Sequence, residues 1–229
     1  MPILGLRVGV IIPALNESAA LPHVLADLPR DVDEVLVVDN GSTDDTAAVA
    51  RARGARVVCE PRRGYGSACQ RGLAELGPCD VVVFLDADYS DFPQELPRLV
   101  QPIAEERADL VIGSRVRGSC QPGALAPHQR FGNAFACALL RILWNQRVSD
   151  LGPFRAIRRE CLHRLQLRDR DYGWTIEMQI QAARHGLRVV EVPVSYRRRI
   201  GQSKISGTVR GSLAAAVKIL STIFRYSLR

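Results

Sequence analysis

Residues 82–93 read VVFLDADYSDFP, in which an apolar run ends in two acids that lie one residue apart. Such a run is typical of a strand that is buried on both faces of a sheet. Because alternate strand residues point to the same side, the carboxylates of Asp86 and Asp88 share a side. A pair of this kind either holds a divalent cation beside a phosphate or forms a solvated turn that caps the next helix. The pair alone favours neither alternative.

The composition fits a single large domain with a packed core, since the chain has 229 residues and 47% of them are hydrophobic. The six cysteines form no C-x-x-C pair, so we expect buried, reduced thiols of a cytoplasmic protein. The apolar run Val8–Ile12 is short and stops at Pro13, which indicates a first strand instead of a signal peptide. No segment reaches the roughly 18 apolar residues that span a bilayer.

The net charge of +7 is concentrated near the end of the chain. Residues 184–229 contain ten Lys or Arg and one acid, which gives +9, so the preceding 183 residues sum to −2. This distribution indicates that the C-terminal fifth meets a phosphate or an anionic surface. An aromatic content of 6% without an aromatic-rich strand argues against stacking on bases, so we expect no nucleic-acid partner.

Apolar runs alternate with helical patterns along the first half of the chain. This alternation predicts an α/β fold with a mostly parallel central sheet and helices on both faces. Ligands of such sheets bind beyond the carboxyl ends of the strands. The expected strands are 7–12, 34–38, 56–59, 81–85 and 109–112, and the expected helices are 18–28, 44–53, 66–76 and 93–106.

The second half is less regular. A loop rich in Gly and Pro at 116–128 and a helical pattern at 129–147 together predict an insertion over 116–147. Helices at 155–165 and 175–185 and a strand at 188–196, broken by Pro193, are expected next. We expect residues 1–206 to form the catalytic domain.

The tail 207–229 is expected to form an amphipathic helix. Apolar residues recur there every three or four positions, at Leu213, Val217, Leu220, Phe224 and Leu228. The apolar stripe either docks on the protein or lies in the membrane interface, with basic residues near lipid headgroups.

Two more polar corners follow predicted strands. In Asp39–Asp44 (DNGSTD), the carboxylate can bind a ribose or base and Ser42 can cap the next helix, although an ordinary strand–turn–helix corner has the same residues. In Arg62–Gly66 (RRGYG), the glycines let the backbone approach a phosphate-bearing ligand. This motif matches neither the dinucleotide fingerprint nor the P-loop.

The combination of motifs resembles family 2 glycosyltransferases with the GT-A fold, the fold of nucleotide-diphospho-sugar transferases, over nearly the whole chain. The motifs occur in the order Val10–Glu17, Val37–Asp44, Gly64–Gly66, Leu85–Asp88 and Gly113–Arg115.

The C-terminal half is similar to the polyprenyl-phosphate sugar synthases, including dolichyl-phosphate mannose and glucose synthases. The chain departs from that group at 150–154 (DLGPF), which is one residue shorter and lacks a serine, and at Ser90, where several relatives have Gln. The motifs that carry this similarity are Phe154–Ala156, Ile176–Met178, Glu191–Pro193 and the R-x-x-G-x-S-K pattern at 198–204.

The resemblance implies a set of site residues. Asp86 and Asp88 would hold Mg²⁺ or Mn²⁺, with Asp88 catalytic. The nucleotide sugar would contact Pro13, Ala14, Asn16, Glu17, Asp39, Ser42, Gly64, Asp86 and Ala87. The acceptor or its phosphate would contact Arg115, Arg130, Arg198, Ser203 and Lys204.

Strand alternation places Arg197 and Arg199 on one face and Arg198 on the other, so we expect Arg198 to point inward. A lipid phosphate is already anionic and needs little help from a base, whereas a hydroxyl acceptor needs a general base. Glu177 is the leading candidate for that base or catalytic role, with an anchoring role as its alternative. Asp91, Asp169 and Asp171 are the other candidates for the base.

The sequence therefore predicts an inverting, metal-dependent hexosyltransferase, with inversion implied by the resemblance alone. It would move mannose or glucose from GDP-mannose or UDP-glucose to a polyprenyl phosphate. The alternatives are transfer to a hydroxyl of a soluble small molecule or cell-envelope glycan, a nucleotidyltransferase, and a catalytically silent subunit that regulates a membrane partner. We expect a cytoplasmic protein, with peripheral contact to the cytoplasmic face of the membrane as an option.

Overall fold

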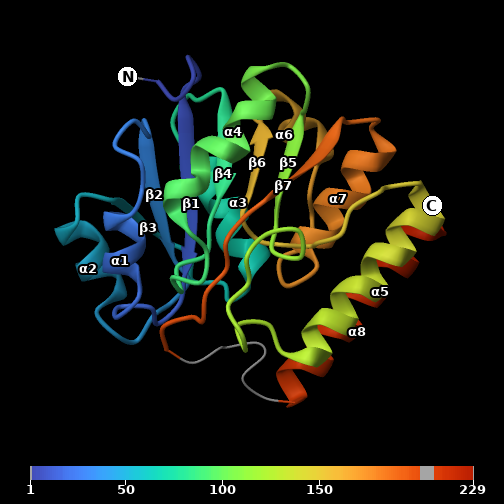
Figure 1. The fold of residues 1–229 in the computed structure, drawn as a ribbon. Coiled ribbons are helices and arrows are strands. Elements are labelled where there is room, and N and C mark those ends of the chain that lie inside the picture. The colour runs from blue at the N-terminus through green and yellow to red at the C-terminus, as the bar shows by residue number, and fades with distance from the viewer. Residues whose placement is uncertain (1, 202–208, 229) are drawn as a thin grey trace.

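A seven-stranded sheet in the order β3-β2-β1-β4-β6-β5-β7 forms the centre of the protein (Figure 1). The computed structural model describes residues 2–201 and 209–228, and places side chains for 2–201 and 216–228. All pairs are parallel except those that β6 makes with β4 and β5. The strands are β1 (Val8–Ala14), β2 (Glu34–Asp39), β3 (Arg56–Cys59), β4 (Val81–Phe84), β5 (Leu110–Ser114), β6 (Arg155–Arg158) and β7 (Val189–Pro193).

Helices cover both faces of the sheet, as the strand pattern predicts. One face packs on α1 (Leu21–Ala26), α2 (Thr46–Ala52) and α4 (Leu96–Ala104), which follows the short 3-10 helix η1 (Pro93–Glu95). The other face packs on α3 (Tyr65–Glu75), α6 (Arg159–Leu165) and α7 (Trp174–Arg184). In β1, Val10 and Ile12 belong to the first core and Ile11 to the second, and all three are fully buried.

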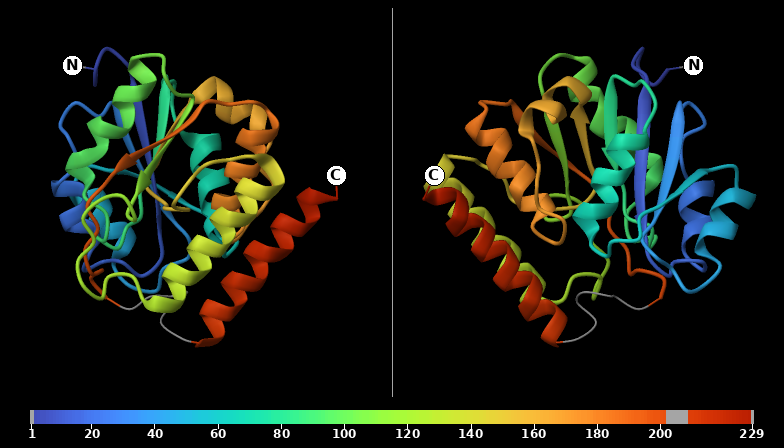
Figure 2. Two further views of the ribbon diagram at one scale, coloured as in Figure 1. Left: turned by 45° about the vertical axis from the view of Figure 1, so that its right-hand side comes forward. Right: turned by 180° about the vertical axis from the view of Figure 1, so that it is seen from behind.

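Two long helices that run in the same direction lie outside this core (Figure 1). α5 (Pro127–Trp144) and α8 (Val209–Ser227) lie side by side, and Figure 2 shows the pair leaning away from the sheet. Their inner faces pack on α7 around Leu140, Ile180 and Ile223. In the part of the chain that the structure describes, no helix combines the length and the apolar character needed to cross a bilayer. The predicted domain boundary at 206 falls outside the described residues.

The segment 155–158 corrects one prediction, because it is a strand and not the start of a helix. Arg155–Arg158 forms β6 and fills the gap between β4 and β5, and α6 begins only at Arg159. Periodicity does not distinguish a strand from a helix in so short a segment. The tertiary pairing decides the outcome, since Ala156 and Ile157 gain ladders on both sides.

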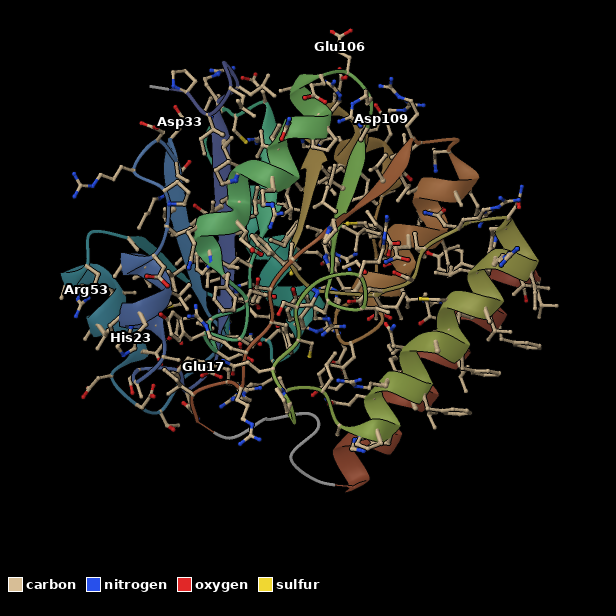
Figure 3. All side chains as sticks on the ribbon, viewed as in Figure 1. Glu17, His23, Asp33, Arg53, Glu106 and Asp109 are labelled. Atoms are coloured by element: carbon tan, nitrogen blue, oxygen red, sulfur yellow. The ribbon has the colours of Figure 1, made fainter. Side chains whose placement is uncertain are left out.

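The parallel pairing brings the carboxyl ends of β1, β2 and β4 to one edge. Ala14 is in register with Asp39, and Ile11 with Phe84. Figure 3 shows Glu17, which follows β1, at the edge opposite to Asp33 and Asp109, which precede β2 and β5. The polar segments after the three strands therefore meet at the Glu17 edge of the sheet.

Candidate active site

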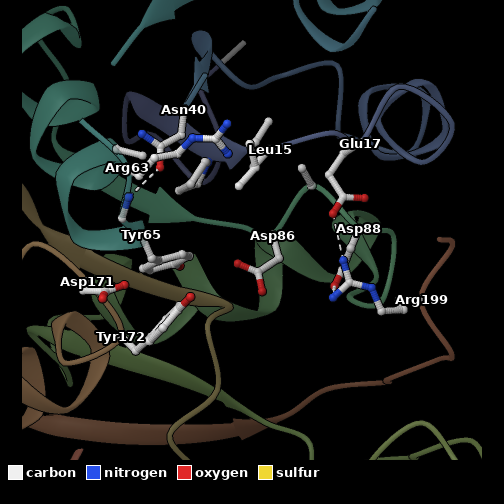
Figure 4. Close-up of a pocket in the computed structure, with 15 residues that line it drawn as sticks. Leu15, Glu17, Asn40, Arg63, Tyr65, Asp86, Asp88, Asp171, Tyr172 and Arg199 are labelled. Carbon is white, nitrogen blue, oxygen red and sulfur yellow. Dashed lines mark hydrogen bonds and ion pairs between the residues drawn. The ribbon is translucent and has the colours of Figure 1, made fainter. Parts of the chain in front are cut away.

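A cleft of about 370 Å³ opens at this edge (Figure 4). Seven of its lining residues are among those predicted to bind the donor or the metal. They are Pro13, Ala14, Glu17, Gly64, Asp86, Ala87 and Asp88.

The acid pair lies in the middle of the cleft. Asp88 is 7% exposed, and its Oδ1 accepts hydrogen bonds from the backbone N and the hydroxyl of Ser90 at 2.9 and 2.5 Å. Its Oδ2 lies 3.1 Å from Nη1 of Arg199, whose Nη2 lies 2.8 Å from Oε1 of Glu17. Asp86 Oδ1 is buried without a hydrogen-bond partner. Arg199 therefore pairs with the charged carboxylate of Asp88, whereas Oδ1 of Asp86 accepts no hydrogen bond.

These residues fit a hard divalent cation. Carboxylate oxygens are the ligands that Mg²⁺ and Mn²⁺ prefer, and a buried, unpartnered carboxylate oxygen is costly unless a ligand satisfies it. Within residues 2–201 and 216–228, no three His, Cys, Asp or Glu side chains gather closely enough to form a complete metal site. Asp86 and Asp88 would hold the cation, and oxygens from outside the chain would complete its coordination.

Metal binding is expected to depend on pH through Asp86. Burial and then the neighbouring charge of Asp88 raise the pKa of Asp86 to about 7. Because a cation competes with the proton for this carboxyl, Mn²⁺ affinity should fall by up to about tenfold for each pH unit below that pKa and be nearly constant above it. Titration of free Mn²⁺ by electron paramagnetic resonance, with UDP or GDP present, measures this between about pH 5.5 and pH 8. An affinity independent of pH would contradict the role of Asp86, and Asp86→Asn is the control that should remove the dependence.

Three predicted donor residues form a hydrogen-bonded layer beside the cleft and do not line it. The backbone N of Ser42 donates to Asp39 Oδ1 at 3.0 Å, and the backbone N of Asn16 donates to the Ser42 hydroxyl at 2.9 Å. Asn16 Oδ1 in turn accepts from the backbone N of Thr43 at 2.7 Å. These bonds tie the corner after β1 to the corner after β2, which fixes the loop that carries Glu17.

The predicted donor and metal contacts leave out eight residues that line the cleft. Asn40 links β2 to the RRGYG motif, since its Oδ1 accepts from the backbone N of Gly64 at 2.8 Å and its amide donates to the carbonyl of Arg62 at 2.7 Å. The sequence signal for Asn40 is its place in the polar corner Asp39–Asp44, directly after a predicted strand. The other residues missed as donor contacts are Leu15, Arg63, Tyr65, Ala68, Asp171, Tyr172 and Arg199.

Arg199, and not Arg198, points into the cleft, so the predicted inward side of this segment was wrong. Arg198 is exposed, and its Nε donates to the carbonyl of Pro122 at 2.9 Å. Arg197 lies 3.3 Å from the ring centroid of Tyr89. In a strand, neighbouring side chains point to opposite faces of the sheet. Because β7 ends at Pro193, residues 197–199 lie outside the sheet, and strand alternation does not determine which of them points into the cleft.

Two other predicted acceptor residues, Arg115 and Arg130, do not line the cleft. Arg115 is committed to buried Asp150, with Nη2–Oδ1 and Nε–Oδ2 distances of 2.6 and 2.9 Å. Arg130 is exposed on α5, and its Nη2 lies 4.0 Å from Cys120 Sγ. Ser203 and Lys204 lie outside the described residues.

Glu177 lies away from the cleft, where it fits the anchoring alternative instead of the general base. It is fully buried, its Oε2 accepts from the backbone N of Arg168 and Asp169 at 3.0 and 2.7 Å, and the Tyr226 hydroxyl donates to its Oε1. Among the other three candidates for the base, only Asp171 lines the cleft. Asp91 is 1% exposed, and burial raises its pKa well above the usual range.

Residues 9–166 match glycosyl transferase family 2, and the chain belongs to that family. It is 44% identical over 223 residues to an uncharacterised glycosyltransferase of Mycobacterium tuberculosis, with 96% of this chain and 99% of the relative covered. It is 36% identical to the undecaprenyl-phosphate mannosyltransferase of Micrococcus luteus, with 93% of each chain covered.

The fold is similar to a solved structure of glucosyl-3-phosphoglycerate synthase from Mycobacterium tuberculosis, in complex with Mn²⁺, UDP and glucosyl-3-phosphoglycerate. The TM-score is 0.78 at 29% identity, with 97% of this chain and 80% of that chain covered. The predictions of a GT-A fold and of a family 2 glycosyltransferase are confirmed.

Proposed function

We propose that this enzyme transfers a hexose, with inversion, from a nucleotide-diphosphate sugar to a polyprenyl phosphate. The donor lies in the cleft, and Asp86 and Asp88 hold Mg²⁺ or Mn²⁺ there. A cation at this position supplies stabilisation of the leaving nucleoside diphosphate. The buried Oδ1 of Asp86, which has no hydrogen-bond partner, supports this assignment, as does the Mn²⁺–UDP complex of the similar synthase.

The outer surface of α5 and α8 is the observation that supports a lipid acceptor most directly. Of the ten large hydrophobic side chains that are exposed among the described residues, four lie on α5 and four on α8 or directly after it. Phe131, Ile142 and Phe224 are 75%, 76% and 65% exposed. We call this set the α5–α8 apolar surface. Its members are Phe131, Phe135, Ile142, Leu143, Val217, Leu220, Phe224 and Leu228.

Contact with a membrane explains this surface better than contact with water does. Exposed apolar side chains that gather on two neighbouring helices, with basic residues on the same helices, are typical of helices that lie in the membrane interface. Arg130 and Arg141 on α5 supply such basic residues, whereas Lys218 and Arg225 on α8 lie 3.0 and 3.8 Å from Asp169 Oδ2. We infer peripheral attachment to the cytoplasmic face of a membrane, where a polyprenyl phosphate resides.

The residues of the cleft also suit a phosphate acceptor. A phosphate oxygen is already ionised near neutral pH, so transfer to it depends on positioning and on charge stabilisation more than on a base. Glu17 and Asp88 are both paired with Arg199, which leaves them poorly placed to accept a proton. The relative named as an undecaprenyl-phosphate mannosyltransferase supports the same acceptor class.

Transfer to a hydroxyl of a small soluble molecule is the second candidate. Asp171 lines the cleft, and burial raises its pKa above the usual range, as a general base for a hydroxyl requires. The similar synthase, solved with glucosyl-3-phosphoglycerate, supports this alternative.

A comparison of acceptors tests the proposed function. Turnover should be high with polyprenyl phosphate in anionic vesicles, and the double variant Phe131→Ser with Phe224→Ser should lower it about tenfold, because two aromatic anchors are lost from the interface. A short, water-soluble prenyl phosphate should be used equally well by both proteins. Release of the nucleoside diphosphate measures each rate.

The matched control is Leu4→Ser with Val116→Ser, which removes two apolar side chains that are each 56% exposed but lie outside the α5–α8 apolar surface. Rapid turnover of phosphoglyceric acid with none on either prenyl phosphate would instead establish the second candidate. Turnover of that acceptor should then be lost in Asp171→Asn.

A further inference from the structure

The segment 168–172 carries Asp171 and Tyr172 into the cleft, and its backbone is held tightly on the side of α3. The backbone N of Ser67 donates to the carbonyl of Arg170 at 2.9 Å. A Cβ atom added at Gly66 would lie 2.2 Å from the carbonyl oxygen of Asp169. No side chain fits at position 66, so the backbone of α3 lies directly against the backbone of segment 168–172.

On its other side, the segment is fastened by two buried carboxylates. Glu177 Oε2 accepts from the backbone N of Arg168 and Asp169, while its Oε1 accepts from the Tyr226 hydroxyl on α8. Asp169 is 4% exposed, and its Oδ2 lies 3.0 Å from Lys218 Nζ. Its Oδ1 accepts from the backbone N of Asp171 at 2.8 Å. Each carboxylate thus connects α8 to the backbone that carries the cleft residues.

We propose that Glu177 and Asp169 are positioning residues that fasten segment 168–172 to α8, so that the placement of α8 sets the placement of Asp171 and Tyr172 in the donor cleft. A buried carboxylate that loses a hydrogen-bond donor is destabilised, because it is shielded from water and has no other partner. The structure therefore favours the state in which segment 168–172 is bound to α8. The inference rests on the part of the proposed function that places the nucleotide sugar in the cleft, and it does not depend on which acceptor is used.

The variant Tyr226→Phe tests the connection with little disturbance, because it removes only a hydroxyl and keeps the ring against Arg184 and Arg225. Combined with Lys218→Met, it should weaken nucleotide binding about tenfold. Calorimetric titration with Mn²⁺ and UDP, and with Mn²⁺ and GDP, measures the affinity without any acceptor. Amide hydrogen exchange in 168–172 should become faster while that of the central strands is unchanged.

The control on the same helix is Ser221→Ala, whose hydroxyl donates to the Lys218 carbonyl within α8 and should leave affinity unchanged. Faster exchange in 168–172 with wild-type nucleotide affinity would overturn the inference, and so would wild-type exchange and affinity in the double variant. A wild-type protein that bound neither nucleotide would overturn the proposed function together with the inference.

The variant Glu177→Gln separates positioning from base catalysis. A glutamine at this position can accept from the two backbone N–H groups with its oxygen and donate to Tyr226 with its amide. Nucleotide affinity and turnover should therefore be retained to within a few fold, whereas Glu177→Ala should weaken affinity as the α8 variants do. A loss of about a hundredfold or more in kcat for Glu177→Gln at unchanged affinity, with one limb of the pH–rate profile removed, would show a general base instead.

Discussion

Replacement of Asp88 by alanine is expected to lower metal-dependent turnover by roughly a thousandfold, the largest effect on activity that we predict. Asp88 is 7% exposed in the cleft, and its Oδ2 lies 3.1 Å from Nη1 of Arg199. Loss of the charge removes one of the two carboxylates available to a cation beside the donor. Release of the nucleoside diphosphate at saturating Mn²⁺ measures the effect.

Two further variants make this result specific. Asp88→Asn keeps an oxygen for the backbone N and hydroxyl of Ser90, so a similar loss of turnover would assign the effect to charge and not to a broken turn. Asp80→Ala, at the opposite edge of the sheet, removes an aspartate whose side chain is 40% exposed and should leave turnover unchanged. Wild-type turnover in Asp88→Ala would exclude the metal hypothesis.

Arg155→Met should cause the largest loss of stability, about 3–5 kcal/mol in the free energy of unfolding. Arg155 is 1% exposed, and its guanidinium lies among backbone carbonyls. It donates to the carbonyl oxygens of Gly152, Leu151 and Thr175 at 3.1, 2.9 and 3.0 Å. Methionine matches much of its length but donates no hydrogen bond, so the three carbonyl oxygens lose this donor.

Urea unfolding followed by circular dichroism checks this value, with Arg71→Met as the matched control. The side chain of Arg71 is 43% exposed on α3 and pairs with Glu75 across one helical turn, so its loss should cost less than about 0.5 kcal/mol. A cost for Arg155→Met that is as small as the control would mean that water replaces the guanidinium at these carbonyls.

The sequence alone predicts most of the fold, because the apolar runs of β1, β2 and β4 are typical of strands that are buried on both faces of a sheet. It also predicts the centre of the cleft, since Asp86 and Asp88 follow directly from the end of a parallel strand. Segment 155–158 was misassigned because strand pairing, and not periodicity, determines its structure.

One physical reason explains why the sequence does not predict the positions of Arg199 and Glu177. The side to which Arg199 points and the partners of Glu177 depend on elements distant in the chain, namely the loop after β1 and α8. No local pattern encodes a contact between residues 177 and 226. Such contacts become visible only once the helices have packed.

The connection between α8 and segment 168–172 has a thermodynamic consequence. Binding free energies at two coupled sites are reciprocal, so any factor by which vesicle binding to α8 changes nucleotide affinity must equal the factor by which the nucleotide changes vesicle affinity. With the fastening intact, the supply of donor and the residence of the enzyme on a bilayer would regulate each other, and no separate regulatory domain would be needed.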